Sequence, residues 1–395
     1  MPSYRSFEDH LNANVGPKRI LSLDGGGLRG MLTVQVLRKI ETILRGRFGR
    51  ELRLCDYFDL IAGTSTGAII AGGLALGMSV DEIEKKYKEL GDKVFMRSFW
   101  RRGIARDAYD GEAVAESLRG VYGTGPLKRD DFKTGLLVVA KRLDTGSTWV
   151  LTNNPEAKYF LPNKKRPATI PNGEYPLWQV VRASTAAPTF FAPEEISIHS
   201  DETRARKDTV GQFIDGGCSP HNNPALQALM AVTMEGYRFN WPTGHDKLLL
   251  VSVGTGKANP AVDTSSKFAG LAAAQGLLAL KNLMEDCGDL VETLLQWLSV
   301  GDTARDIDRE MGRAGPALGG KPMLTYQRYN AMFTAEWFSE VLGQDVDADY
   351  LETMQEMDRP ENLKALAKLG QQLAEAQVRP EHLPSRFDVG VAVSS

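Results

Sequence analysis

The sequence contains few cysteines and histidines and carries almost no net charge. Its 395 residues include three Cys and five His, and none of them forms a CxxC, an HExxH or another paired metal-ligand spacing. This argues against a disulfide framework and a structural zinc site, and three scattered cysteines fit a reducing, cytosolic setting. Lys and Arg number 47 against 50 Asp and Glu, a net charge of −3. Such a balance argues against general nucleic-acid binding, which needs a basic surface.

Long apolar runs are also lacking. The first residues are polar and have no apolar core of the kind found in signal peptides. The longest apolar stretch begins at Ala269, covers about 12 residues and contains Gln275, so it is too short to span a bilayer. We therefore predict a cytoplasmic protein that is at most peripheral to a membrane. Hydrophobic residues make up 42% and charged residues 25%, which is typical of a globular protein and excludes collagen-like, coiled-coil and disordered chains.

Two segments near the start share one pattern, a short apolar strand followed by a glycine turn and an apolar helix. The first has a strand over 19–23 and a helix over 29–47, and the second has a strand over 60–62 and a helix over 67–76. Further strands are predicted at 135–141, 148–152, 212–215 and 247–254. Strands that alternate with helices predict an α/β fold whose central sheet is mostly parallel and has helices on both faces.

The predicted strands stop after Gly256, and the rest of the chain has the pattern of helices and loops. We therefore expect an N-terminal segment over 1–17, an α/β domain over 18–260, and a mainly helical extension or cap over 261–395 that packs on the core.

The turn of the second unit contains a GxSxG motif made by Gly63, Ser65 and Gly67. This motif places a serine on a strained turn between a strand and a helix, where the helix N-terminus stabilises negative charge on reacting oxygens. A plain structural turn has the same pattern. With a strand before it and an apolar helix after it, Ser65 is a candidate nucleophile.

The turn of the first unit is Asp24-Gly-Gly-Gly-Leu-Arg-Gly30, which contains a GxGxxG at Gly25, Gly27 and Gly30. One interpretation is a dinucleotide-binding oxidoreductase, although the expected acidic residue at the end of a second strand is not clear. The other interpretation is an oxyanion hole, because consecutive glycines expose backbone N–H groups at a helix N-terminus. In this second interpretation Arg29 adds positive charge.

A third glycine turn, Asp215-Gly216-Gly217, follows a short apolar strand. An aspartate at the end of a strand can face another loop, so Asp215 is a candidate general base for Ser65. A Ser–His–Asp esterase is the rival mechanism, because His221 lies close to Asp215 in sequence and His245 precedes a strand.

Together, in this order, the motifs DGGGLRG, GTSTG and DGG resemble those of the patatin-like phospholipase family, over roughly residues 18–256. The resemblance extends to the stretch from Ala183 to Glu194. It implies a three-layer α/β/α sandwich and a Ser65–Asp215 dyad that needs no metal. It also implies that Gly25, Gly26, Gly27 and Arg29 form the oxyanion hole, and that the chain hydrolyses fatty-acyl esters of lipids through an acyl-enzyme.

The resemblance also suggests partners. A lipase must reach a phospholipid surface, and the apolar and basic residues between 95 and 102 are a candidate membrane contact. The stretch 270–298 is a candidate lid, core helix or homodimer interface. Some bacterial members of the family act in anti-phage defence and are switched on by cyclic dinucleotides, and this chain is similar in layout. The basic candidates for such a ligand are Arg101, Arg102, Lys164, Lys165 and Arg166.

Overall fold

The computed structural model describes residues 4–91, 109–188, 190–201, 203–257, 272–306, 312 and 320–389. Its strands are β1 (Lys18–Leu23), β2 (Leu60–Thr64), β3 (Gly135–Arg142), β4 (Thr148–Thr152), β5 (Glu194–Ser197), β6 (Val210–Asp215), β7 (Leu248–Val253), β8 (Ser299–Val300) and β9 (Leu324–Tyr329). They form one sheet in the order β5-β6-β3-β2-β1-β7-β9-β8, with β4 beside β3. The strands from β3 to β8 in this order pair in parallel, whereas β4, β5 and β6 join as antiparallel strands.

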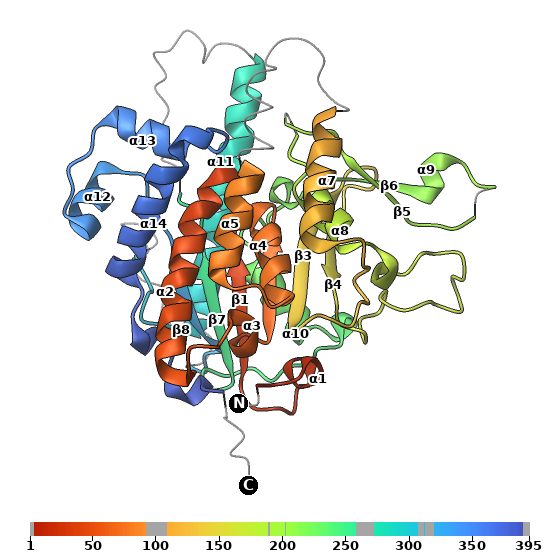
Figure 1. The fold of residues 1–395 in the computed structure, drawn as a ribbon, viewed down its shortest axis with the longest axis horizontal. Helices are drawn as coiled ribbons and strands as arrows, with labels where there is room; N and C mark the ends of the chain where they lie inside the picture. Colours follow the sequence, from red (N-terminus) through yellow and green to blue (C-terminus); the bar gives the residue numbers. More distant parts are fainter. Residues whose placement is uncertain are drawn as a thin grey trace.

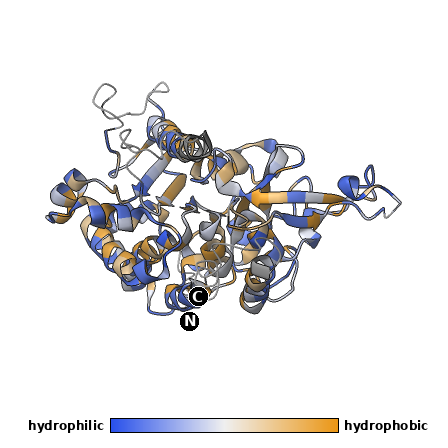
Figure 2. Cartoon of the chain, turned by 90° about the horizontal axis from the view of Figure 1, so that it is seen from above, coloured by the Kyte–Doolittle hydropathy of each residue, from blue (hydrophilic) through white to orange (hydrophobic). Residues whose placement is uncertain are grey.

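Helices lie on both faces of the sheet (Figure 1). They are α1 (Phe7–Leu11), α2 (Gly30–Phe48), α3 (Leu54–Tyr57), α4 (Thr66–Ala75), α5 (Val80–Leu90), α7 (Tyr109–Tyr122), α8 (Leu177–Ser184), α9 (Arg206–Thr209), α10 (Ala225–Thr233), α11 (Ala272–Trp297), α12 (Ala335–Leu342), α13 (Ala348–Gln355) and α14 (Leu363–Gln377). Figure 2, viewed from above and coloured by hydropathy, shows β5, β6 and α9 projecting at one side, away from the helical layers.

Consecutive residues of the central strands face opposite cores, because successive side chains of a strand point to opposite faces of the sheet. In β1, Leu21 packs into the core beneath α2, α4 and α14, whereas Ile20 packs into the core beneath α10 and α11. In β2, Ile61 and Leu60 divide in the same way. The predicted three-layer sandwich with a mostly parallel sheet is therefore confirmed.

The prediction that strands stop after residue 256 is wrong, since β8 and β9 extend the sheet beyond β7. In β9, Thr325 and Gln327 are buried and the side chain of Arg328 is only 8% exposed, so polar residues lie between the apolar ones. Because of these polar residues, β9 does not form the apolar run by which strands were predicted. The helices α11 to α14 agree with the prediction of a mainly helical C-terminal part, and α14 packs against α2.

No helix in the described ranges is long and apolar enough to cross a bilayer. The candidate membrane contact at 95–102, with Arg101 and Arg102, lies outside the described residues.

Candidate active site

The GxSxG motif forms the predicted turn between β2 and α4. Ser65 adopts φ 53° and ψ −126°, a backbone conformation that is uncommon for residues other than glycine and that often marks functional sites. A Cβ atom on Gly63 would collide with the Gly67 carbonyl, and one on Gly67 would collide with the carbonyl of Leu23. Both glycines are therefore required by close backbone approach, and the turn lifts Ser65 out of the sheet.

Sheet register brings Asp215 next to this serine. Thr64, the last residue of β2, pairs with Val139 of β3, and Asp215 of β6 pairs with the following residue, Ala140. Strand β6 thus takes the place beside β3 at the point where β2 ends. The Ser65 hydroxyl donates a hydrogen bond to Asp215 Oδ2 at 2.6 Å. The two residues are 150 positions apart in sequence, and pairing on β3 brings them into direct contact.

The last residue of α8, Ser184, and the segment that follows it hold both members of this pair. Ser184 Oγ accepts the Ser65 N–H at 2.9 Å and donates to the Val139 carbonyl at 2.6 Å. The Asp215 N–H donates to the Ala186 carbonyl at 2.9 Å. Sequence reasoning singled out this stretch but not the role of Ser184, whose only signal is its place among small residues.

Burial shifts the acid–base properties of Asp215. Its side chain is 6% exposed, and this desolvation raises the pKa of the carboxyl to about 6. Hydrogen bonds from Ser65 and from the Gly217 N–H, 2.7 Å from Oδ1, oppose this rise, as does the positive charge of Arg182. The carboxylate is therefore ionised at neutral pH and more basic than an exposed aspartate, as a general base requires.

The glycine loop after β1 lies beside Ser65, but its N–H groups are not all free. The Gly25 N–H donates to the Asn222 carbonyl at 3.1 Å, and the Gly26 N–H donates to Thr66 Oγ1 at 3.2 Å. Gly27 has a φ of 57°, and among the described residues its N–H has no hydrogen-bond acceptor. Of the three predicted oxyanion donors, Gly27 is thus the one that is available in this structure.

A second available donor is the N–H of Thr66. This residue follows Ser65 and begins α4, and the first N–H groups of a helix have no partner within the helix. The N–H after the nucleophile is a common oxyanion donor in strand–turn–helix hydrolases. The GxSxG motif itself is the signal for the Thr66 N–H as a donor, which sequence reasoning missed.

The charged residues of the first motif have distinct surroundings. The Asp24 carboxylate receives two hydrogen bonds from Arg328 of β9, at 3.0 and 2.6 Å. Arg29 is 6% exposed, lies over the ring of Phe333 and donates only to Met357 Sδ among the described residues. Two of its nitrogens, Nε and Nη1, have no hydrogen-bond partner, although the carboxylates of Glu285 and Asp24 act on its charge. Sequence reasoning missed Arg328 because it lies in the overlooked strand.

The remaining motif glycines take structural places. Gly30 begins α2, and Gly216 begins the 3₁₀ turn Gly216–Cys218. Gly217 lies in the same turn and donates its N–H to the catalytic-site carboxylate, as described above.

No histidine is hydrogen bonded to Ser65 or Asp215, although all five lie in the described ranges. The His221 carbonyl accepts from Thr64 Oγ1 at 2.7 Å, and its Nδ1 is buried without a partner. The His245 carbonyl accepts from Thr325 and Arg386. Among these described residues, therefore, no hydrogen bond links a histidine ring to Ser65 or Asp215, as a Ser–His–Asp triad would require.

A cavity of about 1050 Å³ opens onto Ser65, Asp215 and the glycine loop. Helix α11, which covers most of the stretch considered as a lid, core helix or dimer interface, supplies Met284 and Glu285 to the cavity wall. Much of the lining is apolar, with contributions from Ile69, Leu90, Val114, Phe190, Phe191 and Phe333. Its volume and lining suit a long apolar ligand with a polar end. Lys164, Lys165 and Arg166 are exposed and do not line it.

Comparison with known proteins places this geometry in a family. Residues 21–229, more than half of the chain, match the family model described as patatin-like phospholipase. The chain is 30% identical over 243 residues to a protein of Escherichia coli (strain TW11681) described as a cGAMP-activated phospholipase, with 60% of this chain and 62% of that protein covered. A Vibrio cholerae protein of the same description is 33% identical over 243 residues, with coverage of 59% and 61%.

The chain thus spans about three fifths of the length of these relatives. Among solved structures, human GIVD cytosolic phospholipase A2 is similar at 11% identity and a TM-score of 0.42, covering 93% of this chain and 61% of that chain.

Proposed function

Because the chain belongs to the patatin-like phospholipase family, we propose that it is a lipid acyl hydrolase of phospholipase A type. The observation that carries this proposal is the hydrogen bond from Ser65 Oγ to Asp215 Oδ2, 2.6 Å long, at the wall of a largely apolar cavity. Such a dyad combines a nucleophile with its base. The cavity offers the apolar surface that a fatty-acyl chain needs.

The reaction has two steps. Asp215 accepts the Ser65 proton while Ser65 Oγ bonds to the ester carbonyl carbon, and the carbonyl electrons move to its oxygen. The N–H groups of Gly27 and Thr66 are the donors for that oxyanion, and Arg29 adds positive charge. Collapse of the adduct expels the lysophospholipid alkoxide, which takes the proton from Asp215. Water then attacks the acyl carbonyl carbon while it loses a proton to Asp215. Collapse of this second adduct breaks the bond to Ser65 Oγ, which takes the proton back from Asp215, and the fatty acid is released.

The direct test is fatty-acid release from phosphatidylcholine vesicles by wild type, Ser65→Ala and Asp215→Asn. We expect both substitutions to lower the rate at least about 10³-fold, because they remove a unit of the catalytic machinery. Ser200→Ala, on an exposed residue that does not line the cavity, serves as the control and keeps wild-type activity. Undiminished release by Ser65→Ala would refute the proposal.

The same assay tests the absence of a cofactor. No group of three or more His, Cys, Asp or Glu residues within the described ranges is placed to hold a metal ion. The dyad mechanism proposed above assigns the proton transfer to Asp215. EDTA is therefore expected to leave the rate unchanged, and loss of activity that Mg²⁺, Ca²⁺ or Zn²⁺ restores would contradict this part of the proposal.

A second proposal concerns control of the reaction. Two relatives are described as cGAMP-activated phospholipases, which supports a cyclic dinucleotide as the activator of this chain and a role in anti-phage defence. The membrane would then be the substrate surface, which the protein meets from the cytoplasm, and a homodimer is one candidate assembly. Vesicle hydrolysis with and without cGAMP tests the gating, with cyclic di-AMP and cyclic di-GMP as comparisons. A rate that none of the three changes would remove this proposal.

The dinucleotide-binding oxidoreductase is the weaker alternative. In that interpretation the N–H groups of the GxGxxG turn would hold a pyrophosphate. Those of Gly25 and Gly26 already donate to Asn222 and Thr66, which favours the hydrolase. Retention of a nicotinamide cofactor by the purified protein would revive the alternative.

A further inference from the structure

The glycine loop has no side chains with which to hold its own shape, so its neighbours must hold it. The Asp24 N–H donates to the Val253 carbonyl at 3.1 Å. The Gly25 carbonyl accepts from Thr255 Oγ1 at 2.9 Å and from Asn222 Nδ2 at 3.3 Å. These contacts fix the start of the loop against the end of β7 and against the segment after Asp215.

The charged anchor of the loop is the fork between Arg328 and Asp24. Two parallel hydrogen bonds join the guanidinium to the carboxylate, and both side chains are 8% exposed. A bidentate pair of this kind fixes an angle as well as a distance. Asp24 is the residue directly before Gly25. Because the two residues share a peptide bond, fixing the position of Asp24 also fixes the direction in which the glycine loop begins.

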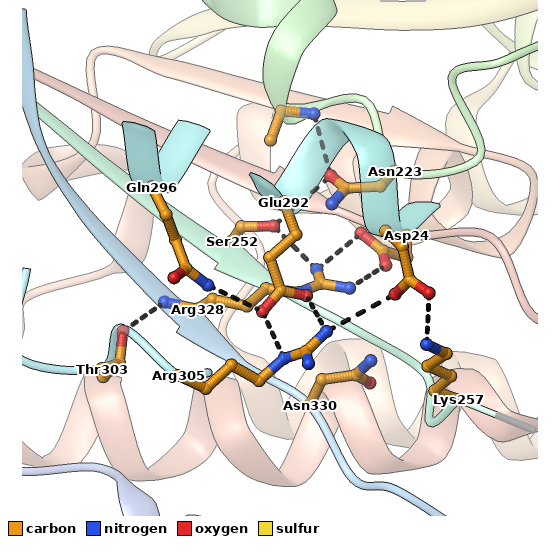
Figure 3. A network of polar contacts seen from close by, with 12 residues as sticks. Asp24, Asn223, Ser252, Lys257, Glu292, Gln296, Thr303, Arg305, Arg328 and Asn330 are labelled. Atoms are coloured by element: carbon orange, nitrogen blue, oxygen red, sulfur yellow. Dashed lines mark hydrogen bonds and ion pairs between the residues drawn. The ribbon is translucent and has the colours of Figure 1, made fainter. Parts of the chain in front are cut away.

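Arg328 is itself held from two other elements (Figure 3). It donates to Ser252 Oγ of β7 at 2.8 Å, and its Nε lies 3.9 Å from Glu292 Oε2 of α11. Glu292 is bound in turn by Arg305 at 2.7 Å, and Asp289 lies between Arg305 and Lys257. Hydrogen bonds to Asp24 and Ser252, together with the nearby Glu292 carboxylate, therefore hold the guanidinium beside the loop.

We propose, on the basis of the hydrolase function above, that Arg328 is a positioning residue. Its two hydrogen bonds to the Asp24 carboxylate orient the glycine loop so that the Gly27 N–H points toward the oxyanion formed on Ser65. Arg328 lies outside the 21–229 range that matches the family model. The part of the chain after residue 260 thus completes the catalytic geometry.

A loop that loses this anchor is expected to stabilise the oxyanion less while binding the lipid as before. Removal of one oxyanion donor lowers kcat by about 10²–10³-fold in other hydrolases, and misplacement costs less than removal. We expect Arg328→Gln to lower kcat about 10- to 100-fold and to change KM less than about 3-fold. Arg328→Lys keeps the charge but not the fork, so it should fall between wild type and Arg328→Gln.

A reversible inhibitor separates positioning from general stability. Ser65 adds to a long-chain trifluoromethyl ketone, its proton moves to Asp215, and the ketone oxygen becomes an oxyanion that the loop must stabilise. A phospholipid with an ether in place of the ester cannot be attacked. Arg328→Gln should lower the affinity for the ketone by the same factor as it lowers kcat, because the ketone adduct and the transition state both contain the oxyanion. The affinity for the ether lipid should stay unchanged.

The matched control is Arg19→Gln. Arg19 forms another buried fork on β1, with Asp59, at 2.9 and 3.0 Å, but at the opposite end of the strand from Asp24. The Arg19→Gln substitution should lower the melting temperature but should not lower the affinity for the ketone relative to the affinity for the ether lipid. The double variant Asp24→Asn/Arg328→Gln should be at most about 3-fold slower than Arg328→Gln, because the two residues act as a unit.

The outcomes are distinct. If Ser65→Ala still hydrolyses lipid, the hydrolase proposal fails and Arg328 has no reaction to serve. If Ser65→Ala is inactive but Arg328→Gln keeps wild-type kcat and ketone affinity, only the positioning role is refuted. An equal loss of affinity for the ketone and for the ether lipid also refutes the positioning role, because the defect then lies in the lipid-binding cavity. If Arg328→Gln does not fold, Asp24→Asn gives the same test, with a drop of about 10-fold expected in both kcat and ketone affinity.

Discussion

Replacing Asp215 by asparagine should make the protein more stable while it removes activity. The carboxylate is buried, and this burial raises its pKa from an ordinary value of 3.8 to about 6. A buried charge with a raised pKa opposes folding at every pH where the folded form is ionised. Asparagine keeps the size, its amide oxygen can accept the hydrogen bond from the Gly217 N–H, and its NH2 group can donate to the Ser65 hydroxyl oxygen.

The size of the effect follows from the two pKa values. The difference between 3.8 and about 6, at 1.36 kcal/mol per unit of pKa, corresponds to about 3 kcal/mol in the free energy of unfolding. The penalty in the wild type is fully present above pH 6. It shrinks as the pH falls, because the folded state takes up its proton first, and it is gone below pH 3.8. Asp215→Asn should therefore gain up to about 3 kcal/mol at pH 8 and about half of that at pH 5.

Urea unfolding of wild type and Asp215→Asn at pH 8 and pH 5 measures this difference. Asp208→Asn, on an exposed aspartate of α9, is the control and should give the same small change at both values. A loss of stability in Asp215→Asn at pH 8, or an equal gain at pH 8 and pH 5, would refute the reasoning about the buried charge.

Three further predictions follow from the geometry. The value of kcat/KM should fall about tenfold per pH unit below about pH 6, where Asp215 becomes protonated and cannot act as a base; a flat profile down to pH 4.5 would contradict this. Gly67→Ala should abolish activity and reduce soluble yield, because its Cβ would collide with the Leu23 carbonyl; Gly46→Ala, which meets no neighbour, is the control. Activity should survive iodoacetamide at pH 8, because burial raises the pKa of Cys218, which lines the cavity, to about 11; rapid inactivation with alkylation of Cys218 would show that this thiol is reactive.

Ser65 and Asp215 could be singled out from the sequence because short motifs mark both residues. Ser65 is flanked by glycines that the turn requires, and Asp215 ends an apolar strand before two more glycines. Their contact depends on β6 replacing β2 beside β3, and neither motif contains this information. The family resemblance supplied the pairing.

The oxyanion loop shows the limit of prediction from a motif. Three glycines in a row appear equivalent in sequence, yet two of their N–H groups are taken by Asn222 and Thr66. Which N–H stays available depends on contacts with residues far away in the chain. Arg328 was overlooked for a related reason, because a charged residue in a strand, here with a side chain 8% exposed, breaks the apolar pattern by which strands are recognised.

Covalent labelling tests the central claim most directly. A long-chain fluorophosphonate should form one adduct with the wild-type protein, and peptide mass spectrometry should locate it on Ser65. Labelling should be absent in Ser65→Ala and at least about 100-fold slower in Asp215→Asn, which lacks the base. An adduct on another serine, or an undiminished labelling rate in Asp215→Asn, would contradict the assignment of the Ser65–Asp215 dyad.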